Sequence, residues 1–290
     1  MFEQLGLIGC GLMGGSFALA LKRAGLVRRV VGYSKSPSTV ERARQLGVID
    51  TGAPSALLAV SGSDLILLAV PVAATEATLK AIRHLLNPNM LVLDVGSTKR
   101  DVVDAARRVL KHDVDLFVPS HPITGREVSG VEYADPDLYT NKQVIITPIE
   151  RTLVAKIEQA EDLWHALGCD VVRMSPEQHD AAFAAVSHLP HMIAFALINS
   201  IIGQPDGKVF MDLAGPGFRD FSRIAAADPQ VWRDVLIANR EEIDAQMQHF
   251  QHALADLQKR IAAGQADELE RLINQASLTR ANWRPAAGVR

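Results

Sequence analysis

The sequence predicts a doubly wound α/β domain with a mostly parallel sheet, followed by an all-helical domain. Two observations lead to this prediction. Short apolar runs alternate with amphipathic stretches from Leu5 to about Met174, and helical periods alone continue from Glu177 to about Ala276. Runs that are apolar at consecutive positions suit parallel strands, because such strands are buried on both faces between layers of helices.

Seven runs are expected to be strands, and five stretches between them are expected to be helices. The strand runs are, in order, LGLIG, RRVVGYS, DLILLAVPV, MLVLDVG, VDLFVPS, KQVIITP and CDVVRM. The helical stretches are Leu12–Ala24, Ser38–Leu46, Ala74–Leu86, Lys99–Leu110 and Arg151–Leu167. The Ser175-Pro176 pair is a boundary signal. We therefore expect domains at residues 1–174 and 175–290, with a loose tail from about residue 283.

Composition excludes several classes of protein. The 290 residues are 48% hydrophobic, and 30 basic against 33 acidic residues give a net charge of −3, so neither nucleic acid nor an anionic membrane is an expected partner. We find no signal-peptide pattern and no apolar run that we judge long enough to span a membrane, so we expect a cytoplasmic protein. Cys10 and Cys169 lack any paired spacing, which predicts reduced thiols and no metal site.

A glycine-rich turn follows the first strand and opens the first helix. Gly9, Gly11 and Gly14 form a G-x-G-x-x-G motif around Leu12 and Met13. Such glycines allow a tight turn, close approach of a pyrophosphate and close helix-to-strand packing, while the helix N-terminus supplies amide donors. A purely structural turn is the alternative. The position in the first β-α unit favours a dinucleotide cofactor.

The end of the second strand bears on which cofactor binds. NAD-binding domains of this kind usually place a carboxylate there, to hold the ribose hydroxyls. This chain has Ser34 and Lys35 instead. A hydroxyl and a cation suit a 2′-phosphate, so we expect NADP to be preferred. The alternative is that Lys35 is a solvated charge and that NAD binds through the backbone and Ser34.

Three polar clusters follow the third, fourth and fifth strand runs, and ligands of open α/β sheets bind at that edge. Val70 and Pro71 follow the third run and are expected to border the cofactor. Ser97 follows the fourth, where it could face the nicotinamide or a substrate hydroxyl. Thr98 and Asp101 have capping-box spacing, so we interpret them as the start of a helix.

His121 follows the fifth run. Pro122 biases it away from helical backbone, and an imidazole titrates near neutrality, about pH 6 to 7, as a base that accepts a hydroxyl proton should. A surface turn is the alternative. His121 is therefore a candidate general base for a dehydrogenase.

The helical part adds further candidates. His188 lies in an apolar helical stretch, where a histidine is more often part of the core, and we interpret His179 and His191 as core residues. Arg219 and Arg223 share a helix face next to a Gly-Pro-Gly break, which suits carboxylate recognition. Asp220 and Arg223 could instead form a simple i, i+3 surface pair.

Together these segments resemble the prephenate/arogenate dehydrogenase family of tyrosine biosynthesis. The resemblance rests on GLIGCGLMGGSFALALK, LAVPV, DVGSTK, SHPITGREVSGVE, SHLPH and FRDFSRIAAADPQVWRD. It implies a Rossmann-type domain followed by a dimerising helical domain, and oxidative decarboxylation of prephenate or L-arogenate to 4-hydroxyphenylpyruvate or tyrosine with hydride transfer to NAD(P). Many relatives have an Asp where this chain has Ser34 and Lys35, which puts a preference for NAD in doubt.

The resemblance also implies roles for individual residues. His121 would accept the ring-hydroxyl proton beside Ser97, and Arg223 would bind a carboxylate. His188, Glu127 and Trp232 would lie in the same site. The apolar segments HMIAFALINSIIG and VWRDVLIANREEIDAQM exceed what a small helical layer buries, which supports a homodimer.

Two alternatives remain at this stage. A hydroxy-acid dehydrogenase of the 6-phosphogluconate type should carry a catalytic lysine on a helix of the second domain, whereas Lys208 lies in a loop and Lys259 lies far along the last helix. A non-catalytic dinucleotide sensor would have no need for His121 and Arg223.

Overall fold

The first half of the chain forms a six-stranded parallel sheet in the order β3-β2-β1-β4-β5-β6. This computed structural model describes residues 1–284. The strands of the sheet are β1 (Phe2–Ile8), β2 (Val27–Tyr33), β3 (Thr51–Gly52), β4 (Leu65–Leu68), β5 (Leu91–Asp94) and β6 (Phe117–Val118). A second sheet, in which β7 is antiparallel to β8 and β8 is parallel to β9, consists of β7 (Ser120–Pro122), β8 (Gln143–Ile146) and β9 (Asp170–Arg173).

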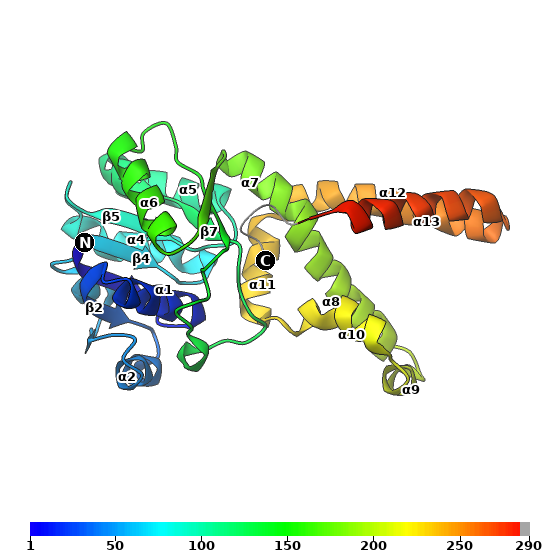
Figure 1. Ribbon diagram of the computed structural model, residues 1–290, viewed down its shortest axis with the longest axis horizontal. Coiled ribbons are helices and arrows are strands. Elements are labelled where there is room, and N and C mark those ends of the chain that lie inside the picture. Colours follow the sequence, from blue (N-terminus) through cyan, green and yellow to red (C-terminus); the bar gives the residue numbers. More distant parts are fainter. Residues whose placement is uncertain (285–290) are drawn as a thin grey trace.

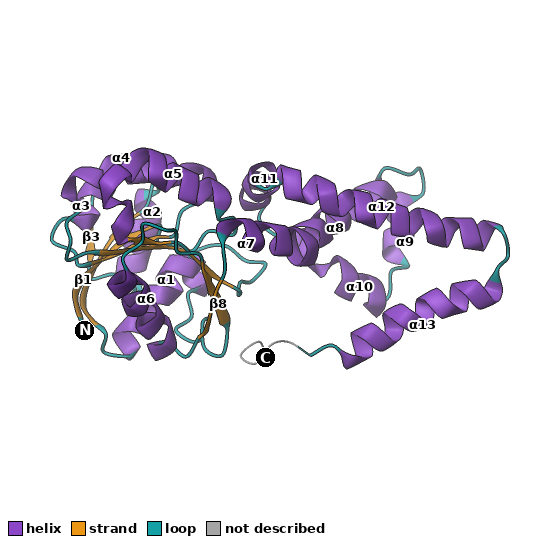
Figure 2. Ribbon diagram, turned by 90° about the horizontal axis from the view of Figure 1, so that it is seen from above, coloured by secondary structure: helices purple, strands orange, loops and turns teal. Residues whose placement is uncertain are grey.

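Helices cover both faces of the large sheet (Figure 2). They are α1 (Leu12–Arg23), α2 (Pro37–Gln45), α3 (Ala56–Val60), α4 (Thr75–Ile82), α5 (Arg100–Leu110) and α6 (Val154–Ala166), with short turns at η1 (Val72–Ala74), η2 (Arg83–Leu85), η3 (Lys111–Leu116) and η4 (Val131–Tyr133). Alternate residues of β4 point to opposite faces. Leu65 and Leu67 pack with α1 and α6, whereas Ile66 and Leu68 pack with α4 and α5. This explains the unbroken apolar runs, because each strand has two buried faces.

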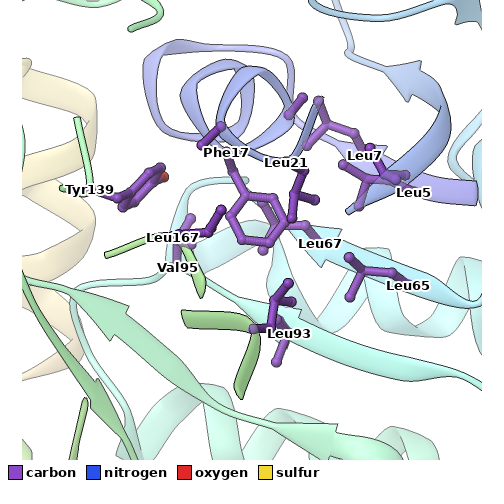
Figure 3. Close-up of a cluster of buried hydrophobic side chains, with 14 of the residues drawn as sticks. Leu5, Leu7, Phe17, Leu21, Leu65, Leu67, Leu93, Val95, Tyr139 and Leu167 are labelled. Carbon is purple, nitrogen blue, oxygen red and sulfur yellow. The ribbon is translucent and has the colours of Figure 1, made fainter. Parts of the chain in front are cut away.

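Phe17 of α1 lies at the centre of the core cluster on the α1 side (Figure 3). Its ring contacts Trp164, with 5.1 Å between centroids, and Tyr139, with 6.2 Å. The Tyr139 hydroxyl donates a hydrogen bond of 2.7 Å to the backbone oxygen of Met13. The first turn of α1 is thereby fixed both by apolar packing and by a hydrogen bond from a buried side chain.

The predicted fold class is confirmed, and each of the seven predicted runs contains strand residues. The run VDLFVPS differs from expectation, because it ends β6 and then continues as β7 in the second sheet. Pro119 separates the two strands and has no N–H to donate to a ladder. His121 therefore lies within β7, not just beyond a buried parallel strand. The short β3 and α3 were not predicted.

The helical half begins at Ser175, which forms a capping box with Gln178. The first helix runs through α7 (Pro176–Phe183), a π-helical turn η5 (Ala184–His188) and α8 (Leu189–Ile202) without a break. The following helices are α9 (Gly207–Asp212), α10 (Pro216–Ser222), η6 (Arg223–Ala226), α11 (Pro229–Ala238), α12 (Arg240–Ala262) and α13 (Ala266–Asn282). In Figure 1 this half projects from the α/β half as two diverging arms, α8 to α10 and the α12–α13 hairpin.

One expectation about membranes was wrong. The continuous helix Pro176–Ile202 has 27 residues and a mean hydropathy of 1.7, which is long and apolar enough to cross a membrane by length and composition. Pro190 lies in the first turn of α8, where a proline does not end the helix. The helix also carries His179, Asp180 and His188, all buried against other parts of the protein. These polar residues make it the central helix of the second half.

The expected loose tail is only partly described. Trp283 and Arg284 follow α13, and the Arg280 guanidinium lies over the Trp283 ring at 5.2 Å. Residues 285–290 lie outside the described residues.

Candidate active site

A cavity of about 260 Å³ lies where the carboxyl edge of the large sheet meets the helical half. Its lining comes from the start of α1, the segment after β5, β7, the loop after β7 and the start of α11. The lining residues are Leu12, Met13, Val95, Ser97, His121, Pro122, Thr124, Gly125, Arg126, Val128, Ser129, Ala227, Asp228, Val231 and Trp232. Glycine-loop residues and the candidate base therefore share one cavity. A larger hollow of about 620 Å³ lies between α12 and α13, far from these groups.

The glycine loop has the geometry that a dinucleotide requires. Gly9 has φ +101°, and a Cβ there would lie 2.1 Å from the backbone oxygen of Ala69. A Cβ on Gly14 would lie 2.1 Å from the Gly9 oxygen, whereas one on Gly11 would meet no atom within 4 Å. Gly9 and Gly14 thus allow the turn and the close helix-to-strand packing, whereas Gly11 leaves open space. Since α1 has neither a side-chain cap nor an acidic residue in its first turn, its amides suit a pyrophosphate.

The other cofactor candidates lie at the same edge of the sheet. The Gly9 N–H donates to the Tyr33 oxygen at 2.8 Å, which places the end of β2 beside the glycine loop. Ser34, half-buried, and Lys35, exposed, follow directly. Val70 and Pro71 follow β4 at the start of η1 and do not line the cavity.

His121 is held by a row of polar groups that crosses from one half of the chain to the other. Its Nδ1 lies 2.8 Å from Nε2 of His179, and Nδ1 of His179 lies 2.7 Å from Oδ1 of Asp180. The Asp180 oxygens also accept the backbone N–H groups of Lys99 and Arg100, at 2.8 and 2.9 Å. These two bonds cap the start of α5, where the sequence suggested a capping box from Thr98.

The hydrogen-bond network assigns the tautomers. An ionised Asp180 can only accept, so His179 donates from Nδ1 and accepts at Nε2. His121 must then donate from Nδ1, which leaves its Nε2 as an unprotonated acceptor. The side chain lines the cavity. This arrangement is what a general base requires.

The backbone of β7 is fixed by a buried ion pair. Lys99 Nζ donates to Asp94 Oδ2 at 2.5 Å and to the Ser120 oxygen at 2.7 Å, and the Ser120 N–H donates to Asp94 Oδ1 at 2.8 Å. Lys99 and Asp94 are both almost fully buried. Both backbone polar groups of Ser120 are thus satisfied by side chains, which sets the position of the next residue, His121.

Burial and neighbouring cations keep these histidines neutral. The pKa of His121 lies well below its usual value, first because the ring is buried and then because of His179, Lys99 and His188. Burial, Lys99 and His188 lower the pKa of His179 to about 2. Burial raises the pKa of Asp180, opposed first by the backbone amides of Arg100 and Lys99; because both its oxygens accept hydrogen bonds, we assign it as ionised.

His188 lies at the end of the π-helical turn, a feature frequent at functional sites. It is fully buried, and its Nδ1 lies 3.0 Å from the Asn239 side-chain nitrogen. Burial lowers its pKa to about 4, opposed by Asp180 and the Ser97 backbone. Its Nε2 makes no hydrogen bond of good geometry with the described residues, and His188 does not line the cavity.

Trp232 forms an aromatic group with two residues of α8. Its ring stacks on His191, with 3.5 Å between centroids, and lies 6.3 Å from Phe195 and 6.1 Å from His188. Trp232 also lines the cavity. His191 therefore orients a lining residue and is not a simple core histidine.

Arg223 and Glu127 form an ion pair between η6 and the loop after β7. Both side chains are partly exposed, and neither lines the cavity. Their charges act on His191 in opposite directions, Glu127 raising its pKa and Arg223 lowering it. Asp220 pairs with Arg219, so the i, i+3 pair of Asp220 with Arg223, which was the alternative interpretation, is not formed.

Five predicted site residues therefore line the cavity, namely Leu12, Met13, Ser97, His121 and Trp232. Interpreting His179 as a core residue missed its contact with His121. Asp180, Lys99, Asp94 and Asn239 were also missed. The adjacent His-Asp pair was the available signal, although its meaning depends on a strand 58 residues away.

Comparison with known proteins identifies the family. The model for the prephenate dehydrogenase nucleotide-binding domain matches residues 17–173, and that for the prephenate dehydrogenase dimerization domain matches residues 175–275. The chain belongs to the prephenate dehydrogenase family. The expected resemblance is confirmed, and so is the expected nucleotide-binding domain.

Individual relatives agree with this assignment. Prephenate dehydrogenase of Bacillus subtilis is 36% identical over 245 residues, 84% of this chain and 66% of that protein, slightly less than two thirds of its length. Cyclohexadienyl dehydrogenase of Zymomonas mobilis is 33% identical over 93% of this chain and 92% of its own. The crystal structure of A. aeolicus prephenate dehydrogenase with hydroxyphenyl propionate and NAD+ superposes with a TM-score of 0.90, at 36% identity, over 97% of this chain and 98% of that one.

Proposed function

We propose that this chain oxidises and decarboxylates prephenate or L-arogenate, giving 4-hydroxyphenylpyruvate or tyrosine. The observation that carries the proposal is the tautomer of His121, whose Nδ1–H is engaged by His179 and whose Nε2 is left as the acceptor on a cavity-lining ring. A cyclohexadienol needs such an acceptor for its ring-hydroxyl proton as hydride departs.

The protein's part in the reaction is to hold and deprotonate the substrate. NAD(P), when bound along the glycine loop, supplies the hydride acceptor. His121 Nε2 takes the hydroxyl proton, and Ser97 shares that hydroxyl. His179 and, beyond it, Asp180 hold the Nδ1 side of the ring, so that Nε2 faces the substrate. The dienone then loses carbon dioxide because the product is aromatic, so no separate acid is needed.

Further residues are proposed to bind and orient the substrate. Trp232 lines the cavity opposite the glycine loop and gives an apolar surface for the ring. His188 is buried next to Trp232 and the Ser97 backbone, and we propose that it holds these two lining residues in place. Arg223 would bind a substrate carboxylate, and Glu127, its partner here, would position that guanidinium.

NADP is proposed as the preferred cofactor, with NAD as the alternative. Ser34 and Lys35 follow β2 at the position where a carboxylate would exclude a 2′-phosphate. Dissociation constants for NADP and NAD, measured on the same preparation, test this. Tighter binding of NAD would contradict it.

We also propose a cytoplasmic homodimer, divided into an α/β domain (1–174) and a helical domain (175–290). The match to a dimerization-domain model and the exposed apolar side chains of the helical half support this. Sedimentation at micromolar concentration should give twice the monomer mass. A monomer would contradict it.

The proposed reaction is tested by a matrix of rates, with prephenate and L-arogenate each assayed with NADP and NAD. At least one pair should give reduced cofactor and carbon dioxide in equal amounts. If no pair reacts while the protein still binds the dinucleotide, the proposed function is wrong.

A further inference from the structure

The loop at residues 123–130 crosses the mouth of the cavity and contributes Arg126 to its lining. Among the described residues that form this lining, Arg126 is the one arginine or lysine. Its side chain is 47% exposed, so part of the guanidinium can reach a ligand. Sequence analysis did not single out Arg126. Its charge is complementary to the cofactor and to the proposed substrates, which are all anionic.

The position of Arg126 is set by a short chain of contacts to α1. Its Nη2 pairs with the Asp135 carboxylate. The Asp135 N–H in turn donates to Ser16 Oγ, at 2.9 Å, in the second turn of α1. Asp135 is also fixed by the Asp137 N–H, at 2.9 Å. The guanidinium is therefore tied to α1 through Asp135 and Ser16.

The chemistry on that side favours a pyrophosphate. The first turn of α1 offers uncapped amides and no acidic side chain, but the glycine loop has no cation of its own. The amides of α1 donate to a pyrophosphate from one side, which leaves its other oxygens for a cation from another segment. An arginine fork matches phosphate oxygens in a bidentate arrangement.

We propose that Arg126 binds the pyrophosphate of the dinucleotide, closing over it from the side opposite the N-terminus of α1. This inference rests on the cofactor binding of the proposed function. Asp135 acts as the residue that positions the guanidinium. Arg223, on η6, has no such tie to α1 and is left for the substrate.

The test uses ADP-ribose, which keeps the pyrophosphate and lacks the nicotinamide. Arg126→Ala should weaken ADP-ribose and NADP about 10- to 100-fold, the loss expected for charge-assisted hydrogen bonds, as measured by calorimetry on the full-length protein. The Michaelis constant for the substrate at saturating cofactor should stay unchanged. Arg23→Ala is the matched control, because Arg23 pairs with Asp137 of the same segment near the far end of α1; it should bind ADP-ribose normally.

A second variant guards against misfolding. Arg126→Lys keeps a cation beside Asp135 but loses the fork, so it should fold and still weaken ADP-ribose about 3- to 10-fold by losing one hydrogen bond. Unchanged ADP-ribose affinity in both variants would overturn the proposal and leave Arg126 as a structural partner of Asp135. A raised substrate Michaelis constant with normal ADP-ribose binding would also overturn it. Because ADP-ribose binding needs no turnover, the first of these results does not depend on the proposed reaction.

Discussion

The two halves of this protein bury their apolar residues very differently. In the α/β half, side chains such as Leu65, Leu67 and Phe17 are fully buried between sheet and helices. In the helical half, large apolar residues stay exposed in numbers, among them Val186, Ile202, Val209, Leu213, Phe221, Ile237, Ile261 and Ile273. The first half buries most of its apolar side chains within itself, whereas the exposed apolar side chains of the second half are what the proposed homodimer would cover.

The chemistry is divided between the halves in a corresponding way. The α/β half supplies the proposed base, His121, and the glycine loop. The helical half supplies His179 and Asp180, which set the tautomer of that base, and His188 and Trp232 beside the cavity. Asp180 also caps α5 of the first half. The base is therefore correctly protonated only when the two halves are packed together.

Replacing the base should have the largest effect. His121→Asn should lower the turnover number by about two to four powers of ten, the usual contribution of a positioned base. In the parent enzyme, activity should fall as pH drops through the His121 pKa, because the protonated ring cannot accept a proton. Burial lowers this pKa, so the limb should lie below the range of about 6 to 7 that the sequence suggested. The variant should lack this limb. If it kept both the limb and near-parental turnover, the base would be elsewhere, most plausibly His188.

Replacing His179 tests directly whether the helical half controls the proposed base in the α/β half. His179→Phe keeps the ring packing against Phe183 but loses the contact to His121, so turnover should fall about 10- to 100-fold, as when an orienting partner of a histidine is lost. The melting temperature should change little, and the acidic limb should shift because a neighbour that lowers the His121 pKa is gone. Lower stability with parental kinetics per folded molecule would make His179 only a core residue.

Arg223 tests whether the helical half binds substrate. Arg223→Ala should raise the substrate Michaelis constant by about one to two powers of ten, from the loss of a charge-assisted hydrogen bond. Cofactor affinity should change little. Arg219→Ala is the control, since Arg219 is paired with Asp220 on the same exposed face. A loss of the same size in both variants would mean that Arg223 acts only through overall charge.

The smallest effect is expected at the cofactor end of the α/β half. Lys35 is exposed, and an exposed ion pair contributes little. Lys35→Ala should weaken NADP about 2- to 5-fold and leave NAD unchanged, by titration of each dinucleotide. Equal losses for both would show that Lys35 does not meet the 2′-phosphate.

Much of the molecule followed from local patterns. Apolar runs predicted all the main strands, because burial on two faces leaves an unbroken apolar signature. The glycine spacing predicted the cofactor turn, since Gly9 and Gly14 each occupy a place where a Cβ would meet a backbone oxygen at 2.1 Å. His121 was singled out by its position after a strand, and the structure places it in the cavity wall.

Other features depend on contacts between segments distant in sequence. Lys99, which fixes β7 together with Asp94, was predicted only as the start of a helix, and His179 was interpreted as a core residue. The sequence predicted Ser120 as the end of a strand. In the structure its N–H donates to Asp94 and its carbonyl oxygen accepts from Lys99.

The sequence alone determined the fold class, the cofactor turn and the identity of the candidate base, because each is encoded in residues close together in the chain. Only the tertiary structure decided the protonation state of that base. This protonation state depends on the hydrogen bond between His121 and His179, 58 residues later. It also depends on the hydrogen bond from the Lys99 N–H to Asp180, 81 residues later. Sequence periodicity reports which residues are buried, whereas a tautomer is set by which donor meets which acceptor after burial.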